Sequence, residues 1–137
     1  MRANRSKVVV AGRVILSVVA GLLAADAVAQ YLAPAPLQES FAHVGMQPGF
    51  QRALPVVTIA CAIPLAIPAT SLLGAILTTG FLGGAISLHV RVDGFPNPPE
   101  LICLALGGAT WLGLLLANPN ACAMVFPTGD ARTGNSQ

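Results

Sequence analysis

The chain has 137 residues, of which 55% are hydrophobic and only 9% are charged, and its formal net charge is +2 at pH 7. An average soluble domain carries about 25% charged residues, so this composition and the mean hydropathy of +0.74 exclude a soluble globular protein. The cations form no basic patch beyond the N-terminal segment, which argues against nucleic-acid binding. The three cysteines include no CxxC pair, so we expect neither a disulfide framework nor a metal site.

A basic N-terminal tail, residues 1–7, precedes an apolar stretch from Val8 to Leu32. A helix needs about 20 residues to cross a hydrocarbon core of about 30 Å, so this stretch predicts the first transmembrane helix. The alternative is a secretory signal peptide, because the A-x-A sequence at 27–29 fits a cleavage site. Arg13 and Asp26 inside the apolar stretch favour a retained helix.

Residues 33–52 are expected to form a loop with one short amphipathic helix in the membrane interface. Its apolar side chains recur with the i, i+4, i+7 spacing of one helical face; they are Leu37, Phe41 and Val44. The second span then runs from about Ala53 to Ile67. Pro64 within it has no amide proton to donate to the carbonyl of Ala60, so we expect a kink there.

The third span, from Leu72 to about Val90, is rich in small residues. Gly80 and Gly84 form a GxxxG motif. Gly83 and Ser87 have the same four-residue spacing and lie beside this motif. Lipid tails are as apolar as leucine, so transmembrane helices associate through close backbone contact, which small residues permit. These four residues therefore predict that the third helix is the most tightly packed one.

A polar loop with three prolines separates the third span from the fourth, which extends from Glu100 to about Ala117. Residues 8–118 thus form one all-α membrane domain, a four-helix transmembrane bundle, and residues 119–137 are expected to be a disordered tail. Most cations lie on the side of the two termini. The positive-inside rule therefore places both termini in the cytoplasm and the protein in the cell membrane, expected to be a bacterial inner membrane.

Polar side chains inside or at the ends of the spans form a candidate cluster. Charges within a span are costly and usually have a partner or a function. The topology gathers six such residues in the outer half of the bundle: Asp26, Gln30, Thr58, His89, Arg91 and Glu100. We expect Asp26 to pair with Arg91, with His89 adjacent, because a guanidinium holds a carboxylate bidentately. The structural alternative is that Arg91 and Glu100 are solvated interface charges and that Asp26 merely pairs with one of them.

The segment IPATSLLGAILTTGFLGGAISLHVRV, residues 67–92, resembles the third helix of the DoxX-like family of small four-helix membrane proteins. Asp26 and the Pro34-Ala35-Pro36 turn also match the pattern of that family, and the resemblance covers residues 16–118. The chain departs from it where many relatives carry ionisable residues; its own residues there are Gln30, Thr58 and Ala69. The family is named after a membrane subunit associated with a thiosulfate:quinone oxidoreductase, so the resemblance implies a link to quinone-dependent redox enzymes.

The sequence contains no nucleophile–base pair, Gly-rich phosphate loop or metal-ligand cluster, so we expect no catalytic residues. Our first hypothesis is an accessory or scaffold subunit in the lipid bilayer, whose partner is a membrane redox enzyme or a second copy of the chain. The resemblance implies that the cofactor, if there is one, is a quinone. We expect no other cofactor. The alternatives are a redox-active or small-molecule-binding membrane enzyme component with a polar site at the outer face, and an oligomeric small-molecule transporter.

Overall fold

The protein is described by a computed structural model that gives the backbone of residues 2–118 and the side chains of residues 5–118. This part of the chain is all-helical, with α1 at Arg2–Leu32, α2 at Ala35–His43, α3 at Pro48–Ala66, α4 at Ser71–Asp93 and α5 at Pro98–Ala117. Four of these helices, α1, α3, α4 and α5, are long and apolar enough to cross a membrane. The prediction of an all-α protein with four spans is therefore confirmed, while the tail at 119–137 lies outside the described residues.

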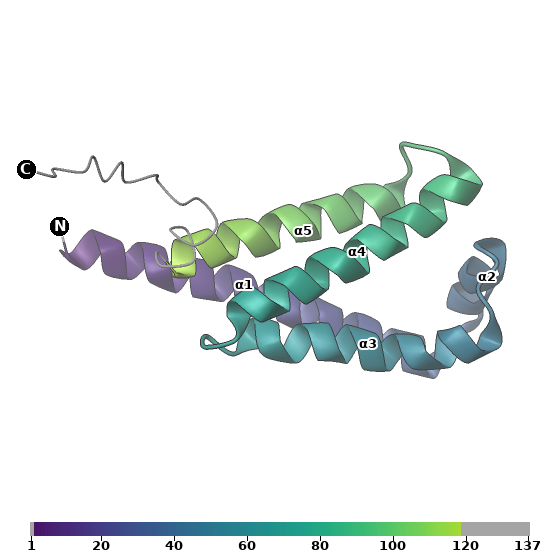
Figure 1. Cartoon of the computed structure of the whole chain (residues 1–137), viewed down its shortest axis with the longest axis horizontal. Helices are drawn as coiled ribbons and strands as arrows, with labels where there is room; N and C mark the ends of the chain where they lie inside the picture. The colour runs from purple at the N-terminus through teal and green to yellow at the C-terminus, as the bar shows by residue number, and fades with distance from the viewer. Residues whose placement is uncertain (1, 119–137) are drawn as a thin grey trace, which may run out of the picture.

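The four long helices form a ring in which each packs against two neighbours: α1 and α4 both pack against α3 and against α5. Figure 1 shows that the start of α1, the end of α5 and the α3–α4 turn lie at one end of the bundle, which we call the terminal end. The helix α2 and the α4–α5 connection lie at the other end, which we call the α2 end. Up-and-down connectivity of this kind follows from the short connections between successive spans.

The hydrophobic core occupies the half of the bundle nearest the terminal end. All four long helices contribute to it, and its most buried members include Val19, Leu23, Leu65, Ala75 and Leu114. Trp111 packs against this core, and its indole N–H donates to the Thr79 hydroxyl at 3.0 Å, which joins α5 to α4. This tryptophan is therefore a packing residue between helices of the bundle.

Two glycines let helix backbones touch in this half. A Cβ at Gly74 of α4 would lie no more than 2.7 Å from backbone atoms of Pro64 and Leu65 in α3. At Gly12 of α1 a Cβ would lie no more than 2.8 Å from backbone atoms of the α5 segment 113–117. The α3–α4 and α1–α5 pairs therefore depend on the absence of a side chain at these positions.

The glycines that the sequence singled out behave differently. Gly80, Gly83 and Gly84 are exposed, and a Cβ at any of them would meet no atom of a neighbouring helix within 4 Å. Ser87 is exposed as well, and its hydroxyl donates to the carbonyl of Gly83 in its own helix at 2.8 Å. The expected close packing through these four residues is not found within the chain, because the buried face of α4 is the opposite one, with Gly74, Ala75, Thr78 and Leu82.

Several helix ends differ from the expected positions. The basic segment 2–7 is the continuous first part of α1, and α3 begins at Pro48 because proline is accommodated in a first helical turn. The helix α4 continues to Asp93 and ends at Gly94, whose φ of +72° is readily adopted by glycine. The hydroxyl of Thr70, the residue before α4, donates to the carbonyl of Pro64 at 3.0 Å, which satisfies one acceptor at the end of the proline-containing helix α3.

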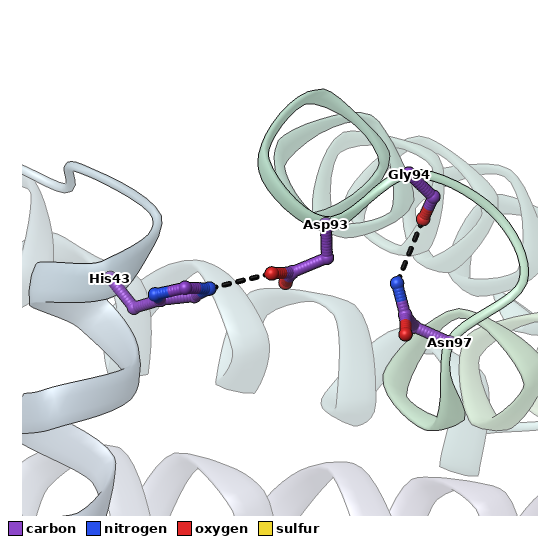
Figure 2. A network of polar contacts seen from close by, with 4 residues as sticks. All are labelled: His43, Asp93, Gly94 and Asn97. Atoms are coloured by element: carbon purple, nitrogen blue, oxygen red, sulfur yellow. Dashed lines mark hydrogen bonds and ion pairs between the residues drawn. The ribbon is translucent and has the colours of Figure 1, made fainter.

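The short helix α2 lies across the α2 end of the bundle. Its Phe41 and the following Val44 are buried, which confirms the predicted amphipathic face, whereas Leu37 is only partly buried. The His43 ring contacts the Asp93 carboxylate, with 2.6 Å between Nε2 and Oδ1, and so connects α2 to the end of α4 (Figure 2). This contact becomes an ion pair when the imidazole is protonated.

Candidate functional site

A chain of hydrogen-bonded polar side chains joins α1 to α3 in the half of the bundle nearest the α2 end. The Gln30 amide donates to the Asp26 carboxylate, with 2.6 Å between Nε2 and Oδ2. The Thr58 hydroxyl lies 3.1 Å from the Gln30 carbonyl oxygen and 3.0 Å from the Leu54 carbonyl, so its single hydrogen serves one of them at a time. Gln30 is buried and Thr58 is fully buried. Asp26 and Gln30 are four residues apart, so they share one face of α1.

A second acid, Glu100, enters the same region from α5. It is fully buried, although it belongs to the first turn of its helix. Its Oε2 accepts a hydrogen bond from the backbone N–H of Asn97 at 3.1 Å, as expected for an acid that caps a helix start. Its Oε1 has no hydrogen-bond partner among the described residues. One oxygen of this carboxyl therefore stabilises the start of α5, and the other makes no hydrogen bond within the described residues.

Cys103 lies one helical turn after Glu100 on α5 and is a partly buried free cysteine. The sequence analysis did not include Cys103 among the candidate site residues. The available signal was its spacing of three residues from Glu100, which places the two side chains on neighbouring positions of one helix face.

Asp26 is the exposed member of the hydrogen-bonded chain. It lies seven residues after Val19, two turns along nearly the same face of α1. Val19 is 2% exposed in the core, whereas Asp26 is exposed. The chain therefore runs from an exposed carboxylate on α1 through the buried Gln30 to the fully buried hydroxyl of Thr58 on α3.

The expected pair of Asp26 with Arg91 is not formed. Within the described residues the one ion pair is His43 with Asp93, and Arg91 is exposed in the last turn of α4. His89 uses its Nδ1 in a contact of 2.9 Å with the carbonyl of Ala85 in its own helix. The physical reason is that Gln30 reaches Asp26 locally from the next turn of α1, while α4 carries Arg91 out to its exposed end. Of the six predicted cluster residues, the structure thus joins Asp26, Gln30 and Thr58 directly, and within the described residues it shows no hydrogen bond or ion pair from Glu100, His89 or Arg91 to them.

Two hollows flank the bundle. A groove of about 550 Å³ at the α2 end is bounded by α1, α2 and α3; its lining includes Gln30, Tyr31, Phe41, Gln51, Arg52 and Pro55. A smaller hollow of about 370 Å³ lies at the terminal end, where Arg13 and Asn118 contribute polar groups. Gln30 belongs both to the groove and to the hydrogen-bonded chain, so the groove adjoins the polar interior.

The site offers mainly acceptor groups. Within residues 5–118, no three His, Cys, Asp or Glu side chains are grouped so that they could hold a metal ion. Two carboxyl groups, an amide, a hydroxyl and a thiol remain, and this set can accept protons or hydrogen bonds and can attract a positive charge.

Comparison with known proteins agrees with this architecture. Neither a curated protein nor a solved structure matches the chain. A family model described as the DoxX-like family matches residues 14–113, a range that begins within α1 and ends within α5. The match covers most of the chain and includes every residue of the polar cluster. The protein is therefore a multi-pass membrane protein and belongs to the DoxX-like family.

Proposed function

We propose that the protein is an accessory or scaffold subunit that packs against a transmembrane helix of a larger membrane assembly. The observation that carries this proposal is the exposed face of α4. Gly80 with Gly84 and Gly83 with Ser87 are each four residues apart, and the two pairs lie side by side, so the four residues form one continuous stripe. No helix of the chain itself covers the stripe. In lipid, such a surface lets a second backbone approach closely, which is the main source of helix association there.

The expected partner is a membrane redox enzyme, including one that uses a quinone. The support for this class of partner comes from the family, which is named after a subunit associated with a thiosulfate:quinone oxidoreductase. A second copy of this chain is the competing occupant of the stripe, and the experiment below separates the two.

The test compares two glycine-to-leucine variants in native membranes. Gly84→Leu places a bulky side chain in the stripe, and Gly108→Leu places the same side chain on an exposed glycine of α5 that also has open space around it. We expect a partner to co-purify in mild detergent with the wild type and with Gly108→Leu, but not with Gly84→Leu. Thermal stability of the three isolated chains should be the same, because neither leucine meets a neighbouring helix.

The recovered partner is identified by mass spectrometry and assayed for a bound quinone or other redox group. A redox protein that is lost only with Gly84→Leu supports the proposal. Recovery of a homo-oligomer instead would contradict the redox partner, and retention of the partner by Gly84→Leu would contradict the role of the stripe.

A further inference from the structure

We propose that the hollow at the terminal end binds the phosphate group of an anionic phospholipid, with the guanidinium of Arg13 as its main contact. This inference goes beyond the accessory role and does not depend on it. It starts from the hollow itself, which has a volume of about 370 Å³ and is lined by residues of all four long helices. This volume falls within the range of small-molecule sites.

The hollow lies at the level where the spans end. Ala66 is the last residue of α3, Ser71 is the first of α4 and Ala117 is the last of α5, and all three line it. Leu16 and Leu65 line it as well and belong to the hydrophobic core, so the hollow is closed toward the interior of the bundle. Because spans end where the hydrocarbon layer ends, a polar group in the hollow lies at the depth of the lipid headgroups.

Two side chains of α1 present donors to this hollow. Arg13 and Ser17 are one turn apart on the same face, and both line the hollow. Neither makes a hydrogen bond or an ion pair within residues 5–118. An arginine in an otherwise apolar stretch is costly unless it has a partner. Its planar fork of five N–H donors fits the oxygens of a phosphate, and the hydroxyl of Ser17 adds one more donor.

The charges at the terminal end favour an anion. Arg5 and Lys7 are exposed on the same helix, beyond the end of the bundle. The described acids all lie in the half nearest the α2 end; they are Asp26, Glu39, Asp93 and Glu100. The fifth acid of the chain, Asp130, lies outside the described residues. Basic pockets between transmembrane helices are suited to phosphate headgroups for this electrostatic reason.

The outer surface of α1 below the hollow can receive an acyl chain. Gly21 lies one turn deeper than Ser17 on the same face, and a Cβ there would meet no atom of a neighbouring helix within 4 Å. Val14 and Val18, which lie beside this face, are apolar and exposed. A soluble phosphate would leave this surface unused, whereas a phospholipid covers it with a chain while its headgroup occupies the hollow. The arrangement therefore favours a lipid as the source of the phosphate.

The direct test measures lipid binding to the full chain in dodecyl maltoside by native mass spectrometry. Dioleoyl phosphatidylglycerol and dioleoyl phosphatidylcholine have the same acyl chains, but only the first has a net negative charge. We expect one phosphatidylglycerol to bind per chain, at least about tenfold more tightly than phosphatidylcholine, because several cations near the headgroup each favour an anionic lipid.

Four variants locate the site. Arg13→Gln should weaken phosphatidylglycerol binding about tenfold or more, and Arg13→Lys should restore part of the loss because it keeps the charge but not the fork. Arg5→Gln removes a cation outside the hollow and should weaken binding by no more than about fivefold, the effect of one cation in a diffuse field. Arg91→Gln removes an exposed cation at the opposite end and should leave binding unchanged. Thermal unfolding of each variant checks that the fold is retained.

A second readout maps the lipid on the wild type in bilayers. Phosphatidylglycerol with a diazirine near the top of one acyl chain, diluted into phosphatidylcholine, should label α1 at Val14 or Val18. Labelling of other helices only, equal binding of the two lipids, or equal losses with Arg13→Gln and Arg5→Gln would each overturn the proposal. Binding of sn-glycerol 3-phosphate as tight as that of phosphatidylglycerol would also overturn it, because the ligand would then be a soluble phosphate.

Discussion

Replacing Gly74 with alanine tests whether the α3–α4 pair is held by direct backbone contact. The added Cβ would lie no more than 2.7 Å from three backbone atoms of Pro64 and Leu65. Backbone atoms cannot turn aside as the end of a flexible side chain can, so the two helices must separate. The same substitution at Gly84, ten residues later on the same helix, meets no atom of another helix within 4 Å.

The expected difference follows from two opposing contributions. Overpacking a close contact costs about 1–3 kcal/mol, and three short backbone contacts place Gly74→Ala at the upper end of this range. Alanine is favoured over glycine within a helix by up to about 1 kcal/mol, and this gain applies at both positions. We therefore expect Gly74→Ala to lower the free energy of unfolding by about 2 kcal/mol, and Gly84→Ala to leave it unchanged or raise it by up to about 1 kcal/mol.

Unfolding can be followed in mixed micelles by titration with sodium dodecyl sulfate. Trp111 is the single tryptophan of the chain, and its indole contacts Thr79 of α4, so its fluorescence reports the α4–α5 contact directly. Circular dichroism provides an independent measure of helix content. Equal midpoints for the two alanine variants would refute the assignment of Gly74 to a backbone contact. A larger loss at Gly84 would instead restore the GxxxG motif as a contact within the chain.

Three further outcomes are expected. Thr58→Val leaves the Gln30 carbonyl oxygen without its partner and should cost about 1–3 kcal/mol in the same titration, whereas Thr58→Ser should cost much less; equal effects would show that the hydroxyl contributes nothing. His43→Ala breaks a largely exposed contact with Asp93 that is worth at most about 1 kcal/mol, so hydrogen exchange should accelerate in α2 alone, and faster exchange throughout the bundle would contradict a local role. Reporter fusions after Arg52 should locate to the outer side and fusions at the C-terminus to the cytoplasm, and a C-terminus outside would refute the predicted orientation.

Hydropathy and spacing predicted the spans well because both act along one helix. The length of an apolar stretch determines whether it can cross a membrane. The i, i+4, i+7 pattern that ends at Val44 was sufficient to predict where α2 lies in the chain. The hydrogen bond between Asp26 and Gln30 was likewise accessible, since residues four apart share a face.

Hydropathy and spacing do not specify how a helix is rotated about its axis relative to its neighbours. Contacts that depend on this rotation could therefore not be predicted from the sequence. The helix α4 is apolar around its whole circumference, so its composition does not distinguish the face with Gly74 from the face with Gly84. A small-residue motif indicates that some helix can approach, but it does not identify which one. The pairing of Asp26 with Arg91 was inferred from membrane depth alone, and depth does not specify whether two side chains point toward each other.

The unequal lengths of the helices determine how the protein meets the bilayer. At 1.5 Å per residue, the 19 residues of α3 and the 20 of α5 span about 28 Å and about 30 Å, while the 31 of α1 reach about 46 Å. Because Gly12 already contacts the end of α5, the residues before it extend past the bundle, with Arg5 and Lys7 exposed on them. A bilayer whose hydrocarbon core is thicker than the length of α3 and α5 must thin around these helices. This thinning costs free energy for every ångström of mismatch. Acyl-chain length is therefore a variable that sets the stability of the reconstituted protein, and the cationic extension of α1 meets the headgroups of one leaflet.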